Sequence, residues 1–258
     1  MADLLFWPAL LAYGEAAVAL VGEVRRPGLA GRLAIWGVRI GWLAQTGLLV
    51  LQASRAEGFP WAGAAGALNL FSWLVVGVYL IWGCTPRFRL LGLAVMPAAA
   101  LLLAGAYVGG GIEGDASRAS SALLAVHVAL VLGAFAGFAL AAGLSGLYLW
   151  HERRLKRRAA AILRLRVPPL DVLERLSGST VAVSLAVLTG GIALGAVSLF
   201  ERGGSFDATM AVTLAAWALF GAMLLLRRLT ALRGRPAAYL VLAGFALAAA
   251  ILPIAHYA

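Results

Sequence analysis

Long apolar stretches alternate with short polar connections along almost the whole chain. Eight stretches reach the length of about 20 residues that an α-helix needs to cross the hydrocarbon of a bilayer. None shows the alternation of apolar and polar residues that a membrane β-barrel strand requires, and lipid offers no partner to open backbone. The pattern therefore predicts eight membrane-spanning helices, at residues 4–22, 33–52, 66–83, 90–108, 121–150, 179–200, 208–226 and 237–254.

The composition agrees with this pattern. Hydrophobic residues make up 63% of the 258 residues and charged residues 12%, whereas soluble proteins have about 25% charged residues. The apolar stretches leave no room for a separate folded domain, so we expect one all-α, polytopic membrane bundle over residues 1–258. The first stretch follows no basic segment, which argues against a cleavable signal peptide.

The distribution of basic residues predicts the orientation of the bundle. Seventeen Lys and Arg residues fall on the odd-numbered connections between the spans and three on the even-numbered ones. Basic connections stay in the cytoplasm, so both termini are expected outside, in a bacterial-type inner (cytoplasmic) membrane. The net charge of +10 has the same origin and does not indicate nucleic acid as a partner.

The fifth span departs from a uniform bundle because it is about ten residues longer than a bilayer requires. It continues directly into the basic sequence HERRLKRR, so we expect one helix that projects into the cytoplasm. The following RVPPLDVLERLSG is typical of a short interfacial helix that starts at the two prolines and ends at Gly178. Residues 151–178 are therefore predicted to form a basic cytoplasmic loop that contains this helix.

Two of the three histidines fall on the predicted external side. His127 lies near the start of the fifth span and His256 near the end of the eighth, whereas His151 lies at the cytoplasmic end of the fifth. A single His in a membrane helix is commonly a packed polar group bonded to a neighbouring helix. Two imidazoles at similar depth can instead hold one metal from opposite sides, as the axial ligands of haem iron do. For His151 we expect an interfacial side chain in a basic cluster.

Other metal and catalytic motifs are absent from the sequence. Cys84 is the single cysteine, and the chain has no CxxC, no HExxH, no carboxylate cluster and no GxSxG elbow. Zinc, di-iron and hydrolytic chemistry therefore have no evident residues, and we do not expect an enzyme.

Glu15 is an acidic residue inside the first span, and Arg39 lies at a comparable height in the second. A buried charge there costs on the order of 3 kcal/mol on insertion scales. The two residues are therefore expected to form an intramembrane polar pair. The alternatives are a protonated Glu15 that faces the bundle and a proton or ligand site.

The whole chain resembles the CcsA/ResC-like cytochrome c assembly superfamily, and especially its HemX-type branch. The resemblance is carried by GALNLFSWLVVGVYL and LLGLAVMPAAALLLAGA for the third and fourth spans and by LLAVHVALVLGAFAGFALAAGLSGLYLWHERRLKRR for the fifth. It continues in RVPPLDVLERL and in the final GRPAAYLVLAGFALAAAILPIAHYA.

The resemblance implies an external site for haem b with His127 and His256 as axial ligands. In that family a tryptophan-rich segment with a Trp-Asp dipeptide lies between the two histidines. The matching stretch here is LFERGGSFDATMAVTLAAWALF, with Phe206-Asp207 at the place of the dipeptide and Trp217 as a downstream aromatic. This stretch departs from the family pattern because Phe206 replaces the tryptophan of the dipeptide. The chain also departs at Gln45, which stands where some members have an intramembrane histidine, so an inner haem site has no evident ligand.

Three functional hypotheses follow. The first is a haem-binding or haem-handling protein of cytochrome c biogenesis, which needs other biogenesis subunits, as in a haem lyase complex, because the chain supplies no thioether chemistry. The second is a membrane regulator or scaffold that acts on a tetrapyrrole-synthesis enzyme or a respiratory assembly factor through the basic cytoplasmic loop. The third, a small-solute transporter, depends only on Glu15 and on the number of spans.

Overall fold

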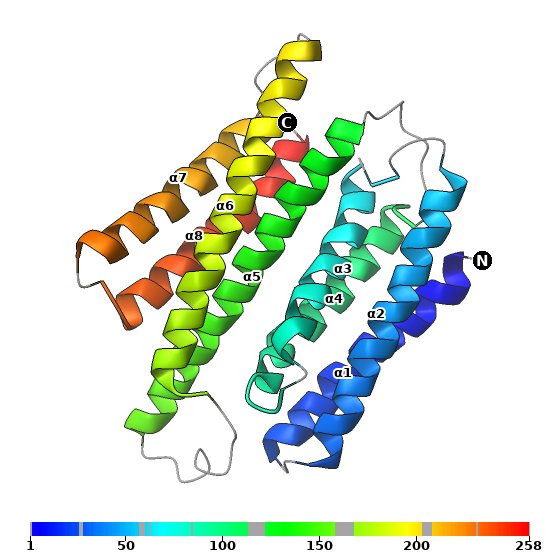
Figure 1. The fold of residues 1–258 in the computed structure, drawn as a ribbon. Helices are drawn as coiled ribbons and strands as arrows, with labels where there is room; N and C mark the ends of the chain where they lie inside the picture. Colours follow the sequence, from blue (N-terminus) through cyan, green and yellow to red (C-terminus); the bar gives the residue numbers. More distant parts are fainter. Residues whose placement is uncertain are drawn as a thin grey trace. The chain divides into compact units, whose positions relative to one another are not determined.

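The computed structural model describes residues 2–25, 28–56, 60–61, 63–83, 85–112, 122–157, 168–202, 208–230 and 232–257. Within these ranges the protein is helical, without a β-strand, as Figure 1 shows. Seven of the described helices are long and apolar enough to cross a membrane, and the described apolar part of the last one is the shorter segment Arg235–Leu247. The prediction of a polytopic all-α membrane protein is confirmed.

Each of the eight predicted spans coincides with one α-helix. The structure extends most of them by a few residues into the polar connections, and a single turn of 3₁₀ helix, η1, precedes the fourth. The bounds are α1 Ala2–Arg25, α2 Leu29–Arg55, α3 Ala64–Gly83, η1 Arg89–Leu91, α4 Gly92–Val108, α5 Ala122–Lys156, α6 Leu170–Arg202, α7 Ala208–Leu229 and α8 Arg235–Tyr257.

The helices form two compact units. Unit 1 contains α1 to α4, and unit 2 contains α5 to α8. In unit 1 each helix packs on the next one, and α1 also packs on α4, so the four helices form a closed ring. The stacked rings of Phe6 and Tyr107, with centroids 4.2 Å apart, lie at this closing contact.

Unit 2 has the same order of neighbours. Its α5 and α6 make the most extensive helix contact, and α8 closes the ring by packing on α5. Phe138 of α5 and Phe220 of α7 stack with a centroid distance of 4.0 Å and are almost completely buried, so they fill the centre of the ring. At Gly137 the neighbouring α6 comes so close that a β-carbon would collide with the Ser184 side chain.

Helix α2 shows how such a unit suits a bilayer. Its outward side carries large apolar residues that are at least half exposed, namely Leu33, Trp36, Ile40, Leu43 and Val50. Its buried side is built mostly from small and polar residues, including Gly31, Ala34, Gly37, Gly41, Gln45 and Gln52. In lipid the outward side is solvated by acyl chains, and the small residues let neighbouring helices approach closely.

The long fifth helix is confirmed, because α5 runs over 35 residues without a break from Ala122 to Lys156. The separate interfacial helix is not. Residues from Leu170 onward form the start of α6, which continues through Gly178 to Arg202 as one helix of 33 residues. Gly178 lies inside this helix, and the Arg227 side chain occupies the place where a β-carbon would be. The rest of the predicted loop, residues 158–167, lies outside the described residues.

Candidate functional site

His127 lies in the second turn of α5 and is half-buried against α6. Its Nδ1 atom is 2.7 Å from the carbonyl oxygen of Gly191. A carbonyl oxygen can only accept a hydrogen bond, so the imidazole must donate from Nδ1. In the neutral ring the lone pair then lies on Nε2. An N–H to carbonyl bond of this kind is how protein histidines that bind metals are usually oriented.

Glycine on α6 makes this position of the imidazole possible. A β-carbon on Gly195 would lie 2.6 Å from Cε1 and 2.9 Å from Nδ1 of His127. The ring therefore lies directly on the backbone of α6, one helical turn beyond the carbonyl that it binds. The position of His127 is set by two glycines as much as by the hydrogen bond.

Gly195→Ala is expected to push the imidazole off α6 and to weaken its bond to Gly191. The loss of one part-buried hydrogen bond corresponds to about 1 kcal/mol of unfolding free energy. The measurement is reversible unfolding in mixed micelles by SDS titration, followed by circular dichroism. Gly190→Ala is the matched control, because the nearest atom to its added β-carbon, Leu130 Cδ1, is 4.0 Å away. Equal stability of the two variants would contradict the close contact.

The other predicted haem-site residues are only partly described. Phe206 and Asp207 lie outside the described residues, and so does the side chain of His256, whose backbone belongs to α8. Trp217 is described and is 40% exposed on α7, where its Nε1 donates to Thr189 Oγ1 at 2.9 Å.

Trp217 and His127 therefore bind α6 at neighbouring residues, Thr189 and Gly191. Positions two residues apart on an α-helix differ by about 3 Å in height and by roughly 200° in direction. The indole and the imidazole consequently lie on nearly opposite sides of α6, so the structure does not bring Trp217 to His127.

The opposite end of unit 2 holds His151 and a small cavity. His151 is 8% exposed, so its side chain is buried in the protein at the end of α5 that carries the basic cluster. The cavity has an internal space of about 10 Å³, roughly enough for one water molecule, and it is lined by residues of all four helices that include Ser145, Tyr148, Glu174, Ser177 and Arg227. Ser145 is 18 residues beyond His127 on α5, which is about 27 Å along the helix axis.

Gln45 occupies the centre of unit 1, at the position that the family resemblance assigned to an inner histidine. It is completely buried, and its Oε1 accepts a hydrogen bond of 2.7 Å from the Tyr13 hydroxyl. Its Nε2 donates to both Oδ1 and the carbonyl oxygen of Asn69, each at 3.0 Å. Both ends of the amide are thus bonded within the protein.

The buried polar chain continues from Asn69 toward the other end of the unit. Asn69 Nδ2 donates to Gln52 Oε1 at 2.9 Å, and Gln52 Nε2 donates to the Gly111 carbonyl at 2.7 Å. Four polar side chains with 2% exposure or less, Tyr13, Gln45, Asn69 and Gln52, therefore link three helices and a loop. At Gln45, the position of the inner histidine in some family members, the interior of unit 1 is therefore occupied by side-chain amides that are hydrogen-bonded to one another.

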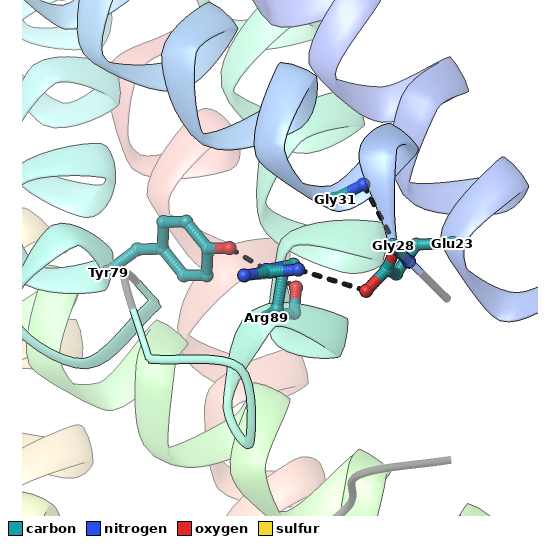
Figure 2. A network of polar contacts seen from close by, with 5 residues as sticks. All are labelled: Glu23, Gly28, Gly31, Tyr79 and Arg89. Atoms are coloured by element: carbon teal, nitrogen blue, oxygen red, sulfur yellow. Dashed lines mark hydrogen bonds and ion pairs between the residues drawn. The ribbon is translucent and has the colours of Figure 1, made fainter. Parts of the chain in front are cut away.

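Unit 1 contains a buried ion pair that the sequence did not indicate. Arg89 Nη1 lies 2.9 Å from Glu23 Oε1, and the two side chains are only 11% and 13% exposed. Figure 2 shows the Glu23 carboxylate between Arg89 and the start of α2, where its Oε2 accepts hydrogen bonds from the backbone N–H groups of Gly28 and Gly31. Glu23 thus satisfies orphan donors at the start of α2 in addition to pairing with Arg89.

Glu15 and Arg39 were the predicted intramembrane pair, and the structure shows one contact of each side chain. The Glu15 carboxylate lies against Gly37 of α2 and is exposed. The Arg39 guanidinium lies over the Trp36 ring, 5.5 Å from its centroid. The pairing of Glu15 with Arg39 stays a prediction.

The family model described as Cytochrome C assembly protein matches residues 61–255, which is about three quarters of the chain. The chain belongs to the cytochrome c assembly protein family. As a member of that family with apolar helices of spanning length, it is a multi-pass membrane protein.

Two curated relatives resemble this cytochrome c assembly protein over part of their length. "Protein HemX" of Brevibacillus brevis is 30% identical over 177 residues, which cover 66% of this chain and 65% of the relative. An uncharacterized 28.8 kDa protein of Azospirillum brasilense is 31% identical over 125 residues, which cover 47% of this chain and 46% of the relative. The chain thus spans less than two thirds of the length of either relative.

Proposed function

We propose that the protein binds or handles haem in cytochrome c biogenesis, with His127 as one axial ligand of haem b. The observation that carries the proposal is the hydrogen bond from His127 Nδ1 to the Gly191 carbonyl. This bond fixes the tautomer and the ring orientation that a ligating Nε2 needs, which makes His127 better suited to iron than a freely rotating imidazole. Membership in the cytochrome c assembly family supports the same role.

The second axial ligand in this proposal is His256 of α8. In unit 2, α8 packs on α5, the helix that carries His127, so both ligands would come from neighbouring helices of one ring. Bound haem would supply an iron centre for delivery, while the chain supplies the oriented imidazole and a membrane setting. The proposed role is therefore non-enzymatic, and other cytochrome c biogenesis subunits are the proposed partners for thioether formation.

The test is the absorption spectrum of the protein purified from its native membrane. We expect a Soret band that is strongly reduced in His127→Ala and absent in His127→Ala/His256→Ala. His151→Ala is the control, because His151 lies 24 residues beyond His127 on α5, about 36 Å along the axis. The control variant is expected to keep its haem. Unchanged haem content in the double variant would refute the ligand assignment.

A haem-free native preparation would instead favour a regulatory or scaffold role for the basic cytoplasmic segment. In that case a tetrapyrrole-synthesis enzyme or assembly factor should co-purify with the protein. Deletion of residues 158–167 should then remove the partner, while the His127→Ala variant should retain it.

A further inference from the structure

One end of unit 2 carries a concentration of positive charge that the proposed haem site does not use. At the end of α5, the start of α6 and the turn between α7 and α8, the described residues include nine Lys and Arg side chains and three carboxylates. The carboxylates are Glu152, Asp171 and Glu174, and each of them is in an ion pair.

These ion pairs leave five cations without a carboxylate within ion-pair distance among the described residues. We call these five the basic end, and all of them are exposed: Arg153, Arg154, Arg157, Arg228 and Arg233. Like charges gathered at one end of a helical unit repel one another, and an anion bound among them relieves the repulsion. The basic end therefore favours an anionic ligand.

Contacts between helices hold the basic end in a defined arrangement. Glu152 of α5 binds Arg235 at the start of α8, and Arg153 Nη2 donates to the Tyr239 hydroxyl at 3.2 Å. These contacts fix the end of α5 against the turn that carries Arg233. The Arg154 guanidinium lies over the Trp150 ring at 5.4 Å from its centroid. Two of the five cations are thus positioned by aromatic side chains.

The same contacts set the level of the basic end relative to a bilayer. Arg233 lies in the turn between two spans, and such a turn emerges at the membrane surface. Tyr239, one turn into α8 and 49% exposed, has the amphipathic character of residues found at the headgroup level. Because Arg153 binds Tyr239, we infer that the basic end lies near the headgroup level.

We propose that the basic end binds the phosphate headgroups of anionic phospholipids. The guanidinium groups supply the forked donors that suit phosphate oxygens, and Trp150 and Tyr239 supply apolar surface for the adjoining glycerol and acyl carbons. An acidic protein surface would match the charge but would not need cations at headgroup depth beside lipid-facing aromatics. The proposal is independent of whether haem is bound.

The experiment measures lipid retained by the full-length protein, purified in a neutral detergent, by native mass spectrometry. Phosphatidylglycerol is titrated against phosphatidylcholine with the same acyl chains. We expect tighter binding of phosphatidylglycerol, weakened about 30-fold in Arg153→Gln/Arg233→Gln, since each cation near the surface contributes roughly fivefold. Arg153→Lys/Arg233→Lys keeps the charge and is expected to retain most of the binding.

The matched control is Arg32→Gln/Arg55→Gln, which removes two exposed cations from unit 1. It should bind phosphatidylglycerol as the unchanged protein does. Equal affinity of the two Gln double variants for phosphatidylglycerol would overturn the proposal, as would equal binding of the two lipids. A co-purifying protein that is lost from Arg153→Gln/Arg233→Gln, with lipid binding unchanged, would assign the basic end to an acidic protein instead.

Discussion

Glu23→Ala is expected to lower the free energy of unfolding by about 4 kcal/mol, the largest single effect that the structure predicts. The substitution leaves the Arg89 guanidinium, only 11% exposed, without its counter-charge. It also leaves the N–H groups of Gly28 and Gly31 without their acceptor at the start of α2. Reversible SDS unfolding in mixed micelles measures the loss.

Two further variants separate the contributions of charge and hydrogen bonding. Glu23→Gln keeps an amide oxygen that can accept from the backbone of α2 and should fall between the unchanged protein and Glu23→Ala. Asp171→Ala is the exposed counterpart, since Asp171 lies in the first turn of α6 and pairs with Arg175, with side chains 65% and 78% exposed. It should cost less than about 1 kcal/mol. A similar loss for Asp171→Ala and Glu23→Ala would contradict the role of burial.

Gln45→Leu is expected to destabilise the protein by about 3 kcal/mol although it adds apolar surface in the middle of a membrane span. The Tyr13 hydroxyl, which is fully buried, loses its acceptor, and Asn69 Oδ1 loses a donor. A buried polar group left without a partner costs about 1–3 kcal/mol. The same SDS titration measures the difference, with Ser54→Ala, an exposed hydroxyl bonded within its own helix, as the control.

Tyr13→Phe provides the test of this explanation. In the Gln45→Leu background it removes the stranded hydroxyl, so we expect the double variant to be more stable than Gln45→Leu alone. If Tyr13→Phe instead adds its full cost to that of Gln45→Leu, the two side chains do not act through their hydrogen bond.

The spans could be predicted from the sequence because the bilayer sets a length that few other structures require. Eight apolar stretches of about 20 residues or more, separated by polar connections, leave little choice of fold, and α5 has the extra length that its sequence indicated. The prediction that a helix ends at Gly178 was wrong. Glycine was interpreted as a helix end, whereas here it admits the Arg227 side chain against the backbone of a continuous helix.

The side-chain contacts could not be predicted in the same way. In a lipid-exposed helix both sides are apolar, so the pattern does not show which residues face inward, and α2 has small and polar residues on its buried side. The ion pair between Glu23 and Arg89 was not predicted, because its two members lie 66 residues apart in sequence. The bond of His127 to a neighbouring helix was among the alternatives, but no residue type identifies the carbonyl of Gly191 as its acceptor.

The closed ring of unit 1 bears on how the protein is made. All four of its helices come from the first 108 residues, and the ring closes through contact between α1 and α4. A nascent chain can therefore insert and close this ring while α5 is still inside the ribosome. The Tyr13–Gln45–Asn69 hydrogen bonds can form at that stage. The buried polar groups of these helices are then satisfied before the second half of the chain is inserted.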